Sequence, residues 1–95
     1  MTRALVETPR FARALRKYTA RDRRRQDCVA ETLLLMGEDV FDPRLKTHSL
    51  SGEMDGHHAC TCGYDCRIVF KLLKDSKTRK EYVLLTDVGT HDEVY

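Results

Sequence analysis

Six side chains between residues 46 and 95 are of the types that transfer protons and bind phosphate. Two imidazoles and a carboxylate can act as general acids or bases, while a guanidinium and an ammonium can stabilise charge developing on a phosphate. A terminal aromatic ring can hold an unstacked base. Such a set suffices to cleave RNA without a metal, by attack of a 2′-hydroxyl on the adjacent phosphate, although ordinary surface positions account for the same residue types. The six are Lys46, His48, Asp65, Arg67, His91 and Tyr95.

A second group of potential ligands lies within ten residues and consists of His57, His58, Cys60, Cys62 and Cys66. Thiolates and imidazoles bind zinc, but this stretch has no Cys-x-x-Cys pair and no second pair of ligands follows at a distance. Strand alternation would place Cys66 on the apolar face with Ile68 and Phe70, where a free thiol packs as a small hydrophobe. We therefore expect reduced cysteines, no metal and no cofactor, with a structural zinc as the alternative.

Charge is distributed unevenly along the chain. Residues 1–25 contain nine basic and two acidic side chains, whereas residues 26–95 contain eight basic and thirteen acidic ones. The run Arg23, Arg24 and Arg25 is the densest part of the basic segment. Such a segment indicates a polyanion or an acidic partner. The alternative is a solvent-exposed helix face.

The pattern of apolar residues predicts the elements that must position these groups. Thr8 and Pro9 are suited to the start of a helix, on which Phe11, Leu15 and Tyr18 form one stripe. A second helix is expected from about residue 21 to residue 37, after which residues 38–56 form a connector. Strands are expected at 4–6, 57–62, 66–74 and 80–88, and the last two should pair antiparallel. This order of elements predicts an α+β fold.

Length and composition place the chain among small globular proteins. Its 95 residues form one domain, 1–95, and a hydrophobic fraction of 41% with 34% charged residues argues against disorder. The sequence contains no apolar run of the roughly 18–20 residues that span a bilayer and no apolar leader. We therefore expect a cytoplasmic protein that does not enter a membrane.

Three motifs give the chain a resemblance to a known family. Residues 45–52 (LKTHSLSG) resemble a connector of the form K-x-H-x-L-x-G, and residues 64–70 (YDCRIVF) resemble a strand that begins Y-D-x-R. Residues 89–95 (GTHDEVY) are similar to the family's C-terminal tail. The chain thus resembles the RelE/StbE toxins of bacterial toxin–antitoxin modules, and their YafQ branch most of all.

The resemblance implies a βααβββ fold, with two N-terminal helices packed on an antiparallel sheet. It implies an endoribonuclease that enters the ribosomal A site and cuts mRNA, and an antitoxin that neutralises it in a hetero-oligomer. Matched by position, His48, Asp65 and His91 would serve proton transfer, Arg67 would face the phosphate, and Tyr95 would take the place of an aromatic residue. Lys46 would support Arg67, and the arginine run at 23–25 would contact RNA or the antitoxin.

One departure from the family pattern concerns the strand before Tyr64, where the YafQ branch has a histidine and this chain has Thr61. A threonine hydroxyl is no general base near neutral pH. Two further hypotheses therefore stand beside the nuclease. One is a ParE-like toxin that binds DNA gyrase without chemistry, and the other is an inactive toxin that acts only in a repressor complex with its antitoxin.

Overall fold

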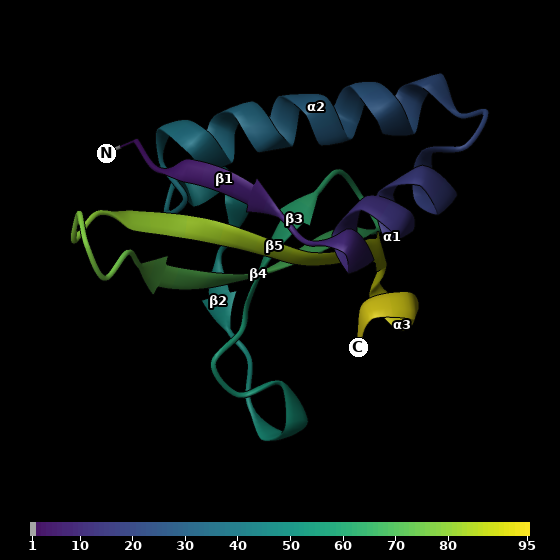
Figure 1. Cartoon of the computed structure of the whole chain (residues 1–95). Coiled ribbons are helices and arrows are strands. Elements are labelled where there is room, and N and C mark those ends of the chain that lie inside the picture. The colour runs from purple at the N-terminus through teal and green to yellow at the C-terminus, as the bar shows by residue number, and fades with distance from the viewer. Residues whose placement is uncertain (1) are drawn as a thin grey trace.

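The computed structural model describes residues 2–95 as a five-stranded sheet with two long helices on one side (Figure 1). None of the helices in this range is long and apolar enough to cross a membrane. The elements in chain order are β1 Ala4–Glu7, α1 Pro9–Thr19, α2 Arg23–Glu38, β2 His48–Ser49, β3 His58–Cys62, β4 Cys66–Lys74, β5 Glu81–Thr90 and α3 His91–Val94, with short 3-10 turns at Pro43–Leu45 and Gly52–Met54.

The sheet is mixed, with strand order β1-β5-β4-β3-β2. Strands β2 to β5 pair antiparallel, as the sequence predicts for β4 and β5, but β1 pairs parallel with β5. The α+β class and the predicted element order are therefore confirmed. The expectation of a purely antiparallel sheet is wrong, because the chain crosses over through both helices before β5 returns beside β1. The structure also adds β2 within the connector and α3 in the tail.

Side-chain caps set the start of both helices. Thr8 caps α1 by accepting a hydrogen bond from the Phe11 N–H, and Pro9 follows as predicted. Asp22 caps α2 by accepting from the Arg25 N–H, so this helix begins two residues later than expected. The reason is that Arg21 adopts a left-handed conformation at φ 55°, which ends the turn between the helices.

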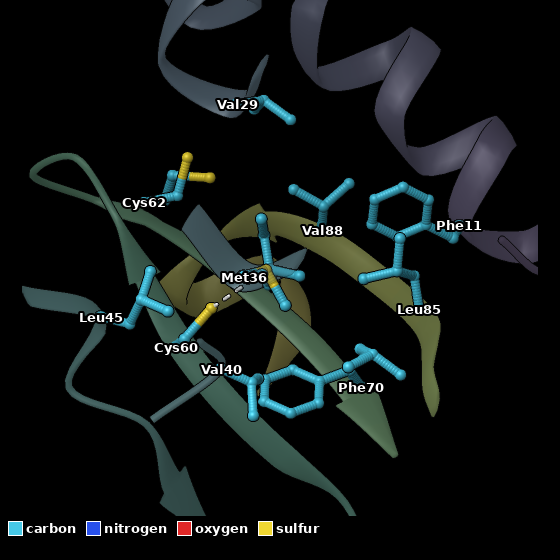
Figure 2. Packing of buried hydrophobic residues seen from close by; sticks show 13 residues of the cluster. Phe11, Val29, Met36, Val40, Leu45, Cys60, Cys62, Phe70, Leu85 and Val88 are labelled. Carbon is cyan, nitrogen blue, oxygen red and sulfur yellow. Dashed lines mark hydrogen bonds between the residues drawn. The ribbon is translucent and has the colours of Figure 1, made fainter. Parts of the chain in front are cut away.

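The core lies between the helices and one face of the sheet (Figure 2). Phe11 of α1 and Met36 of α2 are fully buried against Ile68, Phe70 and their neighbours on β3 and β5. The alternation predicted for β4 is confirmed, because Ile68 and Phe70 point into this cluster. Val69 and Ala59 are also buried, but on the reverse face of the sheet. The middle of the sheet is therefore covered on both sides.

We expect Thr8→Ala to lower the free energy of unfolding by about 1 kcal/mol or more. The hydroxyl caps α1 and also donates to the Leu85 carbonyl at 2.8 Å, which ties the helix to β5. Thr8→Ser keeps the hydroxyl and is the matched control. Urea unfolding followed by circular dichroism measures both variants, and equal midpoints for Thr8→Ala and the wild type would contradict this role.

Candidate functional site

Three of the predicted site residues lie at one end of the sheet, and Arg67 among them is on the face opposite the long helices. Across the strands, Thr61 of β3 lies opposite Arg67 of β4, which lies opposite Gly89 of β5. Because side chains alternate along a strand, this row points away from the Cys60, Ile68 and Val88 side chains in the core. Arg67 is thus placed between two small residues on the reverse face.

Helix α3 positions His91 and Tyr95 beside this row. The helix begins with a complete capping box, in which the Thr90 hydroxyl accepts from the Glu93 N–H at 3.3 Å and the Glu93 carboxylate accepts from the Thr90 N–H at 2.9 Å. These hydrogen bonds hold the pKa of Glu93 below its usual value. The His91 and Tyr95 rings meet edge to face with centroids 4.6 Å apart.

Arg67 of β4 is near enough to Tyr95 for its positive charge to act on the phenol group. Its Nη1 donates to the Cys66 carbonyl at 2.9 Å and more weakly to the Tyr64 carbonyl at 3.5 Å, which fixes the direction of the guanidinium. Partial burial raises the pKa of Tyr95, and the positive charge of Arg67 offsets part of this effect. The structure therefore brings together three of the predicted catalytic residues, Arg67, His91 and Tyr95.

His48 and Lys46 lie toward the opposite edge of the sheet. His48 is exposed on β2 and pairs with Ala59, which places it two strands from Arg67, about 10 Å between strand axes. Its Nδ1 lies 3.1 Å from the Lys46 carbonyl oxygen. Lys46 itself is exposed in a left-handed conformation at φ 52°. These two residues form a separate group that shares a sheet face with Arg67 but does not contact it.

Asp65 is exposed in the turn between β3 and β4, directly before the strand that carries Arg67. Within residues 2–95 it makes no hydrogen bond or ion pair with another predicted site residue. The structure therefore does not assemble Asp65 with His48 or His91, and a bound substrate would have to bridge these groups.

The arginine run occupies the first turn of α2. Arg23 pairs with Asp27 at 3.2 Å. Arg25 lies over the Tyr18 ring at 4.3 Å and donates to the Tyr18 carbonyl at 3.0 Å, so it holds the two helices together. Arg24 is exposed and makes no ion pair in the part of the chain that the structure describes. The three arginines thus differ in role, and only Arg24 is fully available to a partner.

A cavity of about 340 Å³ lies between the two long helices and the end of β5 that leads into α3, and Arg25 of the arginine run lines it. Lys17, Tyr18 and Arg25 line one side of it, and Asp87 and Glu93 line the other. Arg10 pairs with Asp87 at 3.2 Å beside it. Positive charge from the helices therefore reaches the neighbourhood of α3.

The five histidine and cysteine side chains between residues 57 and 66 do not form one cluster. They are distributed between the core and the edge of the sheet. The Cys60 thiol donates to the Met36 sulfur at 3.7 Å, and the His58 ring stacks on Phe70 at 5.7 Å. Burial lowers the pKa of His58, and the neighbouring His48 and His57 add to this effect. Within residues 2–95, no three His, Cys, Asp or Glu side chains are arranged to hold a metal ion.

Residues that position the site were missed at the sequence level, although part of the signal was present. Thr90 and Glu93 have the Thr-x-x-Glu spacing of a capping box, which predicts the start of α3. Gly89 gave no such signal. A Cβ added there would lie 3.1 Å from Glu93 Oε1 and 3.4 Å from Val94 Cγ1, so a larger residue would require Glu93 or Val94 to shift by a few tenths of an ångström.

Comparison with known proteins identifies the class of this fold. The structure of YafQ from E. coli strain BL21(DE3) superposes with a TM-score of 0.77 at 13% identity, covering 98% of each chain. The E. coli DinJ-YafQ toxin-antitoxin complex gives 0.74 at 13% identity, covering 100% of this chain and 99% of that one. A YoeB/ParE toxin from Agrobacterium tumefaciens gives 0.72 at 16% identity, covering 93% and 98%. At these identities, the likeness shows that this chain shares the fold of these proteins, and it shows nothing about activity.

The family follows from the sequence itself. A sequence profile described as "Bacterial toxin of type II toxin-antitoxin system, YafQ" matches residues 3–95, and no curated protein matches significantly. The chain therefore belongs to the YafQ family of bacterial type II toxins. The resemblance expected from the three motifs is confirmed.

We expect Gly89→Ala to displace α3 and to lower the free energy of unfolding by about 1–3 kcal/mol, because the new methyl group overlaps Glu93. NMR spectra should show shifted His91 and Tyr95 side-chain resonances. Gly37→Ala is the matched control, since its nearest outside atom is 3.9 Å away and alanine favours helix α2 by up to about 1 kcal/mol. Unmoved His91 and Tyr95 resonances in Gly89→Ala would contradict the proposed packing.

Proposed function

We propose that this toxin is a ribosome-dependent endoribonuclease that cleaves mRNA without a metal, acting in the cytoplasm. The observation that supports the proposal is that the capped helix α3 holds His91 and Tyr95 near Arg67, which lies at the start of β4. A cation, an imidazole and an aromatic ring are the groups that such a cleavage needs around one nucleotide. Membership of the YafQ toxin family supports the same conclusion.

In the proposed reaction, the 2′-hydroxyl of the substrate attacks its own 3′-phosphate and expels the 5′-oxygen of the next nucleotide. Arg67 stabilises the negative charge that grows on the phosphate, because its guanidinium is already oriented by the Cys66 carbonyl. His91, which is exposed on α3, transfers one proton, and Tyr95 stacks on or orients a base.

In the proposed reaction, His48 or Asp65 carries out the second proton transfer. Thr61 occupies the position opposite Arg67 and supplies no base there. His48 lies on the same sheet face with Lys46 beside it, so an RNA strand that crosses β3 and β4 would reach both His48 and Arg67. In the proposed complex, the bound mRNA would therefore contact both groups of residues at once.

A cognate antitoxin is the proposed protein partner, in a hetero-oligomer that neutralises the toxin. A similar toxin fold has been solved as a DinJ-YafQ toxin-antitoxin complex. The basic side chains of α1 and of the first turn of α2 offer an acidic antitoxin a complementary surface, and the site around α3 is the surface whose coverage would block activity.

We expect His91→Ala to slow mRNA cleavage about 10²-fold or more while leaving the melting temperature nearly unchanged, because this side chain is 56% exposed. Cleavage is measured on translating ribosomes programmed with mRNA, in buffer containing a metal chelator at a level that preserves the ribosomes. The products should end in a 5′-hydroxyl and a 2′,3′-cyclic or 3′-phosphate.

Arg67→Ala should also slow cleavage, and Tyr95→Phe should retain more activity than removal of Tyr95.

Other results would exclude this mechanism. A 5′-phosphate on the products, or full cleavage by His91→Ala, would contradict the proton transfer assigned to His91. Growth inhibition by His91→Ala with no cut mRNA would favour the gyrase-binding alternative. A wild-type protein that is harmless on overexpression would favour the inactive toxin.

The arginine run gives a separate prediction about binding. Arg24→Glu should weaken binding to ribosomes or antitoxin and reduce the salt dependence by about one unit of slope per lost phosphate contact, with no change in melting temperature. Arg25→Ala should instead lower the melting temperature, because Arg25 joins α2 to Tyr18. Titrations at low and moderate salt with both partners test this. Equal affinities for Arg24→Glu and the wild type would show that Arg24 is only a solvated residue.

A further inference from the structure

Three of the four cysteines meet where the first turns of α2 pack against the β3–β4 turn. The Sγ atoms of Cys28 and Cys62 are 3.6 Å apart, although 34 residues separate them in the chain. Cys66 is the cross-strand neighbour of Cys62. The backbone follows these thiols closely, since a Cβ added at Gly63 would lie 3.0 Å from the Cys28 Sγ. All four cysteines are free in this structure.

The geometry favours a bond between two sulfurs over a shared metal ion. A disulfide has an S–S length of about 2.05 Å, so the Cys28 and Cys62 sulfurs, now 3.6 Å apart, need to approach by about 1.5 Å. In the described part of the chain, residues 2–95, no three ligand-type side chains are arranged around a common metal position. Cys60 is directed elsewhere, toward Met36 (Figure 2).

Access from solvent is through Cys28. Its side chain is half-buried, whereas Cys62 and Cys66 are buried. Cys28 lines an open groove of about 440 Å³ together with Thr32, Leu34 and Gly63. A small oxidant can therefore reach the Cys28 sulfur first and leave Cys62 as the second, resolving thiol.

We propose that Cys28 and Cys62 form a redox modification site that accepts a disulfide from a small-molecule disulfide such as oxidised glutathione. The Cys28 thiolate attacks one glutathione sulfur, forming a mixed disulfide and expelling the first glutathione thiolate, which takes up the proton that Cys28 lost. The Cys62 sulfur then attacks the Cys28 sulfur, and the second glutathione leaves with the Cys62 proton. Two protein thiols are oxidised to one disulfide, and one glutathione disulfide is reduced to two glutathione molecules.

The surrounding groups make this exchange slow. Burial raises the pKa of Cys28 to about 11, so little of it is thiolate at neutral pH. Cys66, the cross-strand neighbour of Cys62, by contrast has a lowered pKa because interaction with the Cys62 thiol favours its thiolate. Cys66 can therefore take the Cys62 proton during the second step and pass it to the departing glutathione thiolate. The site is expected to equilibrate over hours, as uncatalysed disulfide exchange does.

The disulfide would fasten α2 to the strand turn that precedes Arg67. The reduced chain holds these segments together by packing alone, while the oxidised chain closes a covalent loop from residue 28 to residue 62. Because such a loop restricts the unfolded chain, the oxidised protein should melt about 5 °C or more above the reduced one. This inference concerns the thiols alone and does not depend on nuclease activity.

The test incubates the reduced full-length protein with oxidised glutathione under nitrogen, blocks the remaining thiols by alkylation and maps the peptides. Trypsin leaves Cys28 in a different peptide from the other three cysteines, and cleavage after Tyr64 separates Cys62 from Cys66. We expect a mass loss of two hydrogen atoms, two alkylated cysteines and a linked pair containing Cys28 and Cys62. Dithiothreitol should reverse both the mass change and the rise in melting temperature.

Cys28→Ser and Cys62→Ser should abolish the linked product, whereas Cys60→Ser is the matched control and should retain it. The map of the wild-type protein decides the question even where a serine variant fails to fold. Four alkylated cysteines at equilibrium, a stable mixed disulfide on Cys28 alone, or a bond between Cys62 and Cys66 would each overturn the proposal. Near-stoichiometric zinc in the purified protein would do the same, because it would assign the thiols to a metal.

Discussion

Strand β4 is the constraint on which both the core and the candidate site depend. It lies between β3 and β5, and its alternating side chains serve two opposite surfaces. Ile68 and Phe70 are fully buried against the helices, while Arg67 emerges on the other face. A shift of one residue in its register would bury the guanidinium and expose the apolar side chains. The stability of the core therefore also fixes the direction in which Arg67 points.

The sequence predicts β4 without error because every second residue is apolar and the turns at both ends are polar. The helices were located almost as well, since Thr8-Pro9 and the spacing of apolar residues are local signals. The parallel pairing of β1 with β5 could not be read in this way, because it joins residues 4–7 to residues 82–85. Strand β2 was missed for a different reason: its two residues are too short to show a period.

For the candidate site as well, the local sequence indicates the residue types but not the distances between them. Residue types and the family resemblance identified Arg67, His91 and Tyr95, and the structure places them together because α3 folds back onto β5. His48 and Asp65 were equally plausible from their types, yet one lies on the edge strand and the other in an exposed turn. The separation between side chains depends on strand order and on the backbone at Gly89, and neither is a property of the local sequence.

Thr61, which stands where the family pattern has a histidine, is one of two small residues that flank Arg67. Thr61 and Gly89 flank Arg67 in the same row, so the guanidinium has no bulky or charged neighbour on either adjacent strand at this level. Its Nη1 donates to the Cys66 carbonyl, and in the proposed mechanism the remaining N–H groups would bind the phosphate. A histidine in place of Thr61 would add a proton carrier but would also narrow this space. In the proposed mechanism, Arg67 would therefore stabilise charge from an open row of the sheet, while proton transfer would rest on side chains of α3 and β2 or on Asp65.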